Sequence, residues 1–143
     1  MNSLFQNKGL RINGVIHLTP KDAYDLCING AVAVDIREEY ELDYKLLDVP
    51  ESIFIANTKF KTTYEILSKT RALIIVDTVG LRSKDAVIFL QEQGYTNVAN
   101  LNGGLVDWDK DKLPMKVDKY AELSGSCACM LKQMKKIKII KPN

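Results

Sequence analysis

The stretch Ala72-Leu73-Ile74-Ile75-Val76-Asp77-Thr78-Val79-Gly80-Leu81-Arg82-Ser83 decides the fold of this chain. Its first five residues form an uninterrupted apolar run, which is typical of a parallel β-strand buried on both faces. The run ends in a short glycine-containing loop, and a predicted helix follows at once and ends at Gly94. The apolar residues of this helix fall at helical spacing and are Ala86, Val87, Phe89 and Leu90. A strand, a loop and a helix in this order are the repeating unit of α/β proteins.

Helices and strands alternate on both sides of this stretch. A helix is predicted from Thr19, which can cap the free amides, through Pro20 at the first helical position, to a stop at Gly30. The apolar run 31–36 follows directly and predicts a buried strand. Further strands are expected at 52–55 and 98–101, and short helices at 61–69 and after 102–104. This alternation predicts an α/β fold with a central, mostly parallel sheet flanked by helices on both faces.

The chain of 143 residues has the size of a single domain. We expect residues 1–14 to be an N-terminal extension, 15–114 the domain, and 115–143 an appended tail. The second boundary rests on a change of composition after Pro114, where small residues give way to a basic end. The basic residues of this end are Lys132, Lys135, Lys136, Lys138 and Lys141.

Composition points to an ordinary globular protein, with 46% hydrophobic and 27% charged residues. The net charge of +2 is too small to indicate nucleic acid or membrane binding. No apolar run is long enough to span a bilayer, and we expect no secretory signal at the start of the chain. Three cysteines do not make a disulfide framework, and their odd number fits a reducing compartment. The expected location is therefore the cytoplasm.

The loop from Asp77 to Ser83 is the best candidate for a binding site, because ligands of α/β sheets sit at the carboxyl ends of strands. A tight turn at Gly80 would direct several backbone N–H groups at one point, and the following helix adds its positive end. Arg82 adds a permanent cation with a forked set of donors. The loop is therefore predicted to hold a negative group.

The same loop, residues 77–83, resembles the active-site loop of the rhodanese family, which normally reads Cys-x-x-Gly-x-Arg-Ser. Three further segments resemble that family and follow in its order. Residues 33–38 resemble its Asp-x-Arg-Glu strand end, 49–53 the segment after a family His-Ile pair, and 98–108 its closing Gly-Gly and Trp signature. Together they cover roughly residues 17–114. The resemblance implies a single rhodanese-like domain.

The resemblance also implies sulfur transfer, in which a cysteine thiolate takes a sulfur atom from a donor such as thiosulfate and holds it as a persulfide. The loop lowers the pKa of that thiol and stabilises the anionic persulfide. The position that matches the cysteine is Asp77. A carboxylate cannot hold a transferable sulfur, so ordinary rhodanese chemistry is not expected at this position. Asp77 is instead expected to be a fixed anion held by Arg82 and the loop amides.

Two more residues are expected to support the loop. In the family the loop arginine pairs with nearby acidic residues, so the resemblance implies that Arg82 pairs with Asp35, with Arg37 beside it. Asp48 falls where the family often has a histidine, and the sequence assigns it no role beyond capping a turn.

Cys127 and Cys129 form a Cys-x-Cys pair directly before the basic end. These thiols could carry a persulfide, form a disulfide, bind a soft metal, or be idle groups. Nearby lysines would favour the reactive thiolate. Two closely spaced ligands are too few for a structural zinc site and His17 is the only histidine, so no metal or other cofactor is predicted. Cys27 lies on the apolar face of the first helix and is expected in the core.

Two functional hypotheses remain. The first is a non-catalytic binding or regulatory module that uses the loop from Asp77 to Ser83 for recognition. The second is a sulfurtransferase or sulfur carrier whose reactive thiol has moved to Cys127 or Cys129. The first ranks slightly ahead because loss of the nucleophile is the simpler change. The partner would be a protein or a small sulfur compound; nucleic acid is not expected, because no aromatic residues stand among the lysines.

Overall fold

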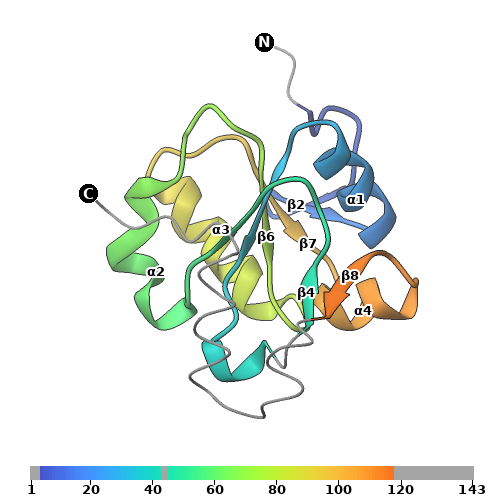
Figure 1. Ribbon diagram of the computed structural model, residues 1–143. Coiled ribbons are helices and arrows are strands. Elements are labelled where there is room, and N and C mark those ends of the chain that lie inside the picture. Colours follow the sequence, from blue (N-terminus) through green and yellow to red (C-terminus); the bar gives the residue numbers. More distant parts are fainter. Residues whose placement is uncertain (1–3, 43–44, 118–143) are drawn as a thin grey trace.

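The computed structural model describes residues 4–42 and 45–117, which form one main sheet covered by helices (Figure 1). The sheet has six strands in the order β1-β2-β7-β6-β3-β5. Only the β1–β2 pair is antiparallel; the other four pairs are parallel. The strands are β1 (Leu10–Ile12), β2 (Val15–Leu18), β3 (Val32–Asp35), β5 (Ser52–Phe54), β6 (Leu73–Val76) and β7 (Val98–Leu101). The predicted central, mostly parallel sheet is confirmed.

Four α-helices cover the two faces of this sheet (Figure 1). Helices α1 (Pro20–Ile28) and α4 (Gly104–Lys110) contribute to one apolar cluster, and α2 (Asn57–Thr63) and α3 (Leu81–Glu92) to the other. Successive residues of a strand point to opposite faces, so β6 and β7 feed both clusters. The helices lie on both faces, as the sequence predicted.

Helix α1 forms for the local reasons that predicted it. The Thr19 hydroxyl accepts a hydrogen bond from the Asp22 N–H at 3.2 Å, and Pro20 occupies the first turn. The helix ends at Ile28, and Gly30 follows in the left-handed region with φ +112°. Both ends of α1 are therefore determined by residues adjacent in sequence.

Helix α2 differs from the prediction of a helix at 61–69. The structure has α2 at Asn57–Thr63, followed by a 3-10 helix at Tyr64–Ile66. The earlier start depends on contacts distant in sequence: the Thr58 N–H and hydroxyl donate to the Glu38 carboxylate at 2.9 and 3.0 Å. The Glu38 carboxylate, from another segment, thus accepts a hydrogen bond from a backbone N–H of the first turn of α2 that has no partner within the helix. No residue next to the helix in sequence indicates this start.

Structured elements extend past both expected domain boundaries. Strand β1 lies within the segment expected to be an N-terminal extension. Strand β8 (Met115–Val117) pairs antiparallel with β4 (Lys45–Leu47), so the segment expected to be a tail begins with a strand. Cys127 and Cys129 lie outside the described residues. Within residues 4–42 and 45–117, no helix has the length and apolar content needed to cross a membrane.

Candidate functional site

The loop after β6 is built by a buried strand on one side and the first turn of α3 on the other. Asp77 follows the last residue of β6, and Gly80 caps α3 with φ +92°. Positive φ is costly for residues with a side chain, so glycine permits the sharp turn here. The turn brings the Arg82 N–H, in the first turn of α3, within 3.0 Å of the Asp77 carboxylate at the end of the strand.

The Asp77 carboxylate receives the donors of its own loop. It accepts hydrogen bonds from the Thr78 N–H at 2.7 Å and from the Arg82 N–H at 3.0 Å. The Arg82 guanidinium adds a third donor, with Nη2 at 2.7 Å from Asp77 Oδ1. Asp77 is only 1% exposed, so these contacts replace solvent. The predicted combination of loop amides and arginine is present, and a side chain of the loop already occupies it.

Arg82 makes a second ion pair, with Glu41 of the 3-10 helix Glu39–Glu41. Its Nη1 and Nη2 donate to the two carboxylate oxygens of Glu41 at 2.8 and 2.6 Å, which is the bidentate geometry that arginine favours. The hydrogen bond to Glu41 and the pair with Asp77 raise the pKa of Arg82 above its usual value. Two carboxylates therefore share one guanidinium, and the cluster carries a net negative charge.

The expected pair between Arg82 and Asp35 is wrong. Asp35 binds Arg37, whose Nη2 lies 2.8 Å from Asp35 Oδ2, and both residues are buried. The backbone N–H of Arg37 also donates to this carboxylate, so Asp35 is hydrogen-bonded to the residue two positions later, whereas Arg82 pairs with Glu41 and Asp77. Arg37 then donates to the Lys45 carbonyl at 3.0 Å. The Asp35–Arg37 pair thereby holds the segment that follows the 3-10 helix carrying Glu41.

Hydrogen bonds from Arg82 lower the pKa of Glu41 from 4.5 to about 2. A carboxyl group whose pKa is depressed by folding stabilises the folded state above its unfolded pKa, and this contribution is lost as the pH falls through the folded pKa. We therefore expect Glu41→Gln to lower stability at neutral pH and to flatten the loss of stability between pH 4.5 and about 2. Denaturant unfolding at several pH values measures this. Glu39→Gln removes an exposed carboxylate of the same 3-10 helix and should leave the slope in that window unchanged.

The N-terminus of α4 closes the loop from the other side. Leu105 and Val106 donate backbone hydrogen bonds to the carbonyls of Asp77 and Thr78 at 2.9 and 3.0 Å. This approach requires Gly104, since a Cβ atom there would lie 2.5 Å from the Asp77 carbonyl oxygen and 2.4 Å from that of Thr78. Gly104, part of the Gly-Gly signature noted in the sequence, therefore permits the close contact that fixes the backbone of the loop.

A buried polar network that sequence reasoning missed supports the loop from below. Asn100, in the middle of β7 and 1% exposed, donates to the Gly80 carbonyl at 3.3 Å and contacts His17 Nδ1 at 3.1 Å. Its side-chain oxygen accepts from the hydroxyl of Ser83. The one signal in the sequence was a polar residue, Asn100, inside an apolar strand. Buried polar groups are nearly always hydrogen-bonded, so such a residue indicates polar partners nearby.

Glu41 was missed as well, although it lies in the run Glu38-Glu39-Tyr40-Glu41 directly after the Asp-x-Arg-Glu segment. Nothing in the spacing of that run indicates which carboxylate reaches Arg82. Asp48 takes no part in the site: it is exposed, and its nearest cation is Lys116 at 3.7 Å.

A family model described as the rhodanese-like domain matches residues 19–111. The chain belongs to the rhodanese-like family. It is 31% identical over 99 residues to thiosulfate sulfurtransferase GlpE from Haemophilus influenzae, covering 68% of this chain and 91% of that protein. A sulfurtransferase from Allochromatium vinosum is 30% identical over 82 residues, covering 57% and 75% of the two chains.

Solved structures agree with this family. A rhodanese-related protein from Thermoplasma volcanium matches with a TM-score of 0.62 and 26% identity, covering 69% of this chain and 95% of that chain. A polysulfide-sulfur transferase homodimer from Wolinella succinogenes shares the fold, with a TM-score of 0.64 and 24% identity over 71% and 78% of the two chains. The match to the family model, residues 19–111, contains both the loop and Glu41.

Among the described residues, the thiol of this rhodanese-like domain lies in the core. Cys27, the cysteine within the described residues, is 2% exposed in the cluster beneath α1, and burial raises its pKa to about 12. The described part of the chain also contains no group of three or more His, Cys, Asp or Glu residues placed to hold a metal ion. Cys127 and Cys129, the other two candidates from the sequence, lie outside that part.

Proposed function

We propose that this rhodanese-like domain lacks the family's catalytic cysteine and serves as a non-catalytic binding or regulatory module. The observation that carries the proposal is the Asp77 carboxylate, which accepts from the Thr78 and Arg82 amides and from the Arg82 guanidinium. These donors would otherwise be available to an anionic sulfur species. A carboxylate neither accepts nor releases sulfur, so persulfide chemistry has no nucleophile at this position.

Cys27 does not replace the missing nucleophile. Sulfur transfer needs a thiolate, and a pKa of about 12 caused by burial keeps Cys27 protonated at neutral pH. The side chain is also closed to a donor molecule, being 2% exposed. Within the described residues, therefore, the fold supports recognition rather than turnover.

The outer rim of the loop has the composition of a docking surface. Val79 and Leu81 are 51% and 65% exposed, and Val106 of the adjoining α4 is 45% exposed. Val79 and Leu81 follow Thr78 in the loop, and the Thr78 carbonyl accepts a hydrogen bond from the Val106 N–H while its hydroxyl contacts Glu41. Exposed aliphatic side chains over a rigid base are typical of protein recognition sites, because burying them on association is favourable. The expected partner is a protein that presents a complementary apolar surface.

The second candidate function is a sulfurtransferase or sulfur carrier that uses a relocated thiol. The sequence feature that favours it is Cys127-x-Cys129 followed by lysines, which would stabilise a thiolate or a persulfide. The curated relatives named as sulfurtransferases give this reaction its precedent in the family.

Mass spectrometry of the intact chain after incubation with thiosulfate, without reductant, separates the two functions. The non-catalytic module predicts no added sulfur, whereas GlpE from Haemophilus influenzae, treated in parallel, serves as the positive control. Sulfur mapped to Cys127 or Cys129 and removed by a thiol would overturn the proposal in favour of the carrier. Cys127→Ser with Cys129→Ser is the matched variant, and it should abolish any such signal.

A further inference from the structure

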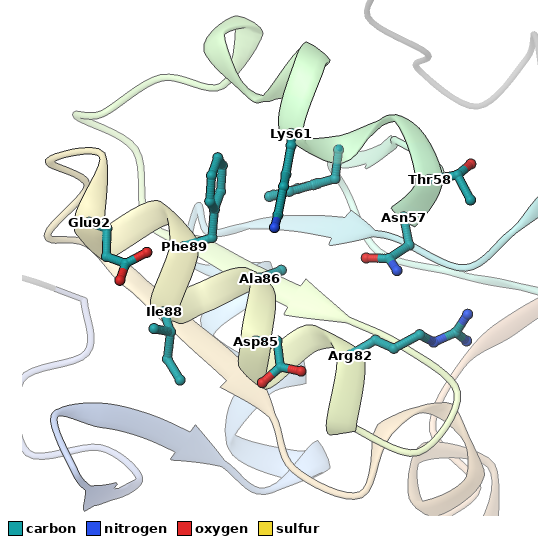
Figure 2. A pocket seen from close by; sticks show the side chains of 10 residues that line it. Asn57, Thr58, Lys61, Arg82, Asp85, Ala86, Ile88, Phe89 and Glu92 are labelled. Atoms are coloured by element: carbon teal, nitrogen blue, oxygen red, sulfur yellow. The ribbon is translucent and has the colours of Figure 1, made fainter.

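A groove of about 450 Å³ lies between α2 and α3, beside the loop (Figure 2). Its volume falls in the range of small-molecule pockets. Figure 2 shows Phe89 and Lys61 between the two helices, and Asp85, Ile88 and Glu92 following one another along α3. The lining residues from α2 are Asn57, Thr58, Phe60 and Lys61, and those from α3 are Arg82, Asp85, Ala86, Ile88, Phe89 and Glu92.

Helix α3 has two distinct faces. One face packs into the core through Val87 and Leu90, which are fully buried. The second face follows the spacing i, i+3, i+4, i+7 and lines the groove through Asp85, Ile88, Phe89 and Glu92. Ile88 is 40% exposed. This face therefore presents two apolar side chains between two carboxylates that lie about 10 Å apart along the helix axis.

Some charged side chains of the groove form salt bridges and others do not. Asp85 and Glu92 make no salt bridge with another described residue. The charge of Arg82 is taken up by Glu41 and Asp77. Lys61 is the other cation of the groove, and its ammonium group lies 5.6 Å from the centre of the Phe89 ring. A ligand that carries cations on both sides of an apolar group would pair the free carboxylates and cover Ile88 and Phe89.

We propose that the groove binds residues 130–141 of this same chain, Met130 to Lys141. The sequence MLKQMKKIKIIK combines the two chemistries that complement the groove: five lysines and six apolar residues, with no acidic residue. The lysines match the carboxylates at Asp85 and Glu92, and the apolar residues match the exposed part of α3. The inference uses a surface different from the rim of the loop and does not depend on the proposed function.

The position at which the described fold ends permits this contact. Strand β8 ends at Val117, which pairs with Lys45, so residues 118–129 separate it from Met130. A segment of that length can reach roughly 40 Å. A domain of this size has a radius of gyration of about 13 Å, so every part of its surface lies within that reach.

Paramagnetic relaxation tests the proposal on the full chain. A spin label attached to Cys127 and Cys129 will leave Cys27 unlabelled, because Cys27 is buried. We expect the amide signals of Asp85, Ile88 and Glu92 to lose most of their intensity, while those of α1 on the opposite face keep theirs. A label that spares the α3 signals would overturn the proposal.

Charge reversal and mixing experiments sharpen this test. Asp85→Lys with Glu92→Lys should restore the α3 signals, whereas Asp25→Lys with Asp109→Lys makes the same change of net charge on α1 and α4 and should not. If both pairs of substitutions restore the α3 signals, the contact is general charge attraction, and the proposed binding site is wrong. In a second sample, chain that carries the spin label but no ¹⁵N is mixed with ¹⁵N-enriched chain that carries no spin label. Broadening in the mixture as strong as in the single labelled chain would assign the groove to a second molecule instead.

Discussion

Asp77→Cys is expected to give this chain thiosulfate sulfurtransferase activity. The substitution places a thiol where the Thr78 and Arg82 amides and the Arg82 guanidinium converge. These donors and the positive end of α3 stabilise a thiolate and then an anionic persulfide. Transfer from thiosulfate to cyanide should rise at least about tenfold above that of an Asp77→Ser chain, which presents the same loop without a thiolate.

The gain is measured in a background with Cys127→Ser and Cys129→Ser, so that only the new thiol can react. A persulfide mapped to residue 77 confirms that the activity arises there. If the variant folds but neither binds sulfur nor transfers it, the donors of the loop are insufficient for the family's chemistry. The assignment of Asp77 to the position of the catalytic cysteine would then be wrong.

Gly104→Ala is expected to cause a large loss of stability. A Cβ atom would lie 2.4 and 2.5 Å from two carbonyl oxygens of the loop backbone, at a residue with φ +61°. Neither oxygen can withdraw without breaking the hydrogen bonds to Leu105 and Val106. Positive φ and overpacking together should cost on the order of 3 kcal/mol in the free energy of unfolding, measured by denaturant titration.

Gly14→Ala is the matched control. Gly14 also has positive φ, +81°, but a Cβ atom there meets nothing within 4 Å. Only the backbone cost remains, about 1 kcal/mol. Equal losses for the two variants would show that the contact between α4 and the loop does not constrain the backbone of the site.

The elements that the sequence predicted well are those whose signals are local. The β6 run is apolar and short, the start of α1 is marked by Thr19 and Pro20, and the loop is marked by Gly80. In each case residues adjacent in sequence satisfy the backbone or define the buried face. The same locality explains why the sequence alone could predict an anion-binding loop at residues 77–83.

The parts that could not be predicted depend on partners distant in sequence. Arg82 pairs with Glu41, 41 residues away, because Arg37 already occupies the Asp35 carboxylate. Helix α2 begins early because Glu38 satisfies its first turn. Strand β8 exists only as the partner of β4. Sequence patterns report which side chains need a partner, but the choice among several carboxylates is made by the tertiary fold.

The most direct test of the account follows the amide signals of Thr78 and Arg82 while thiosulfate is added to the wild-type chain. We expect no saturable shift, because the Asp77 carboxylate already accepts from both N–H groups. Asp77→Ala should leave the two N–H groups without their carboxylate partner, so thiosulfate should give a saturable shift at the same two amides. A saturable shift in the wild-type chain would show that the loop is open to a sulfur donor, which contradicts the central claim that its own carboxylate fills it.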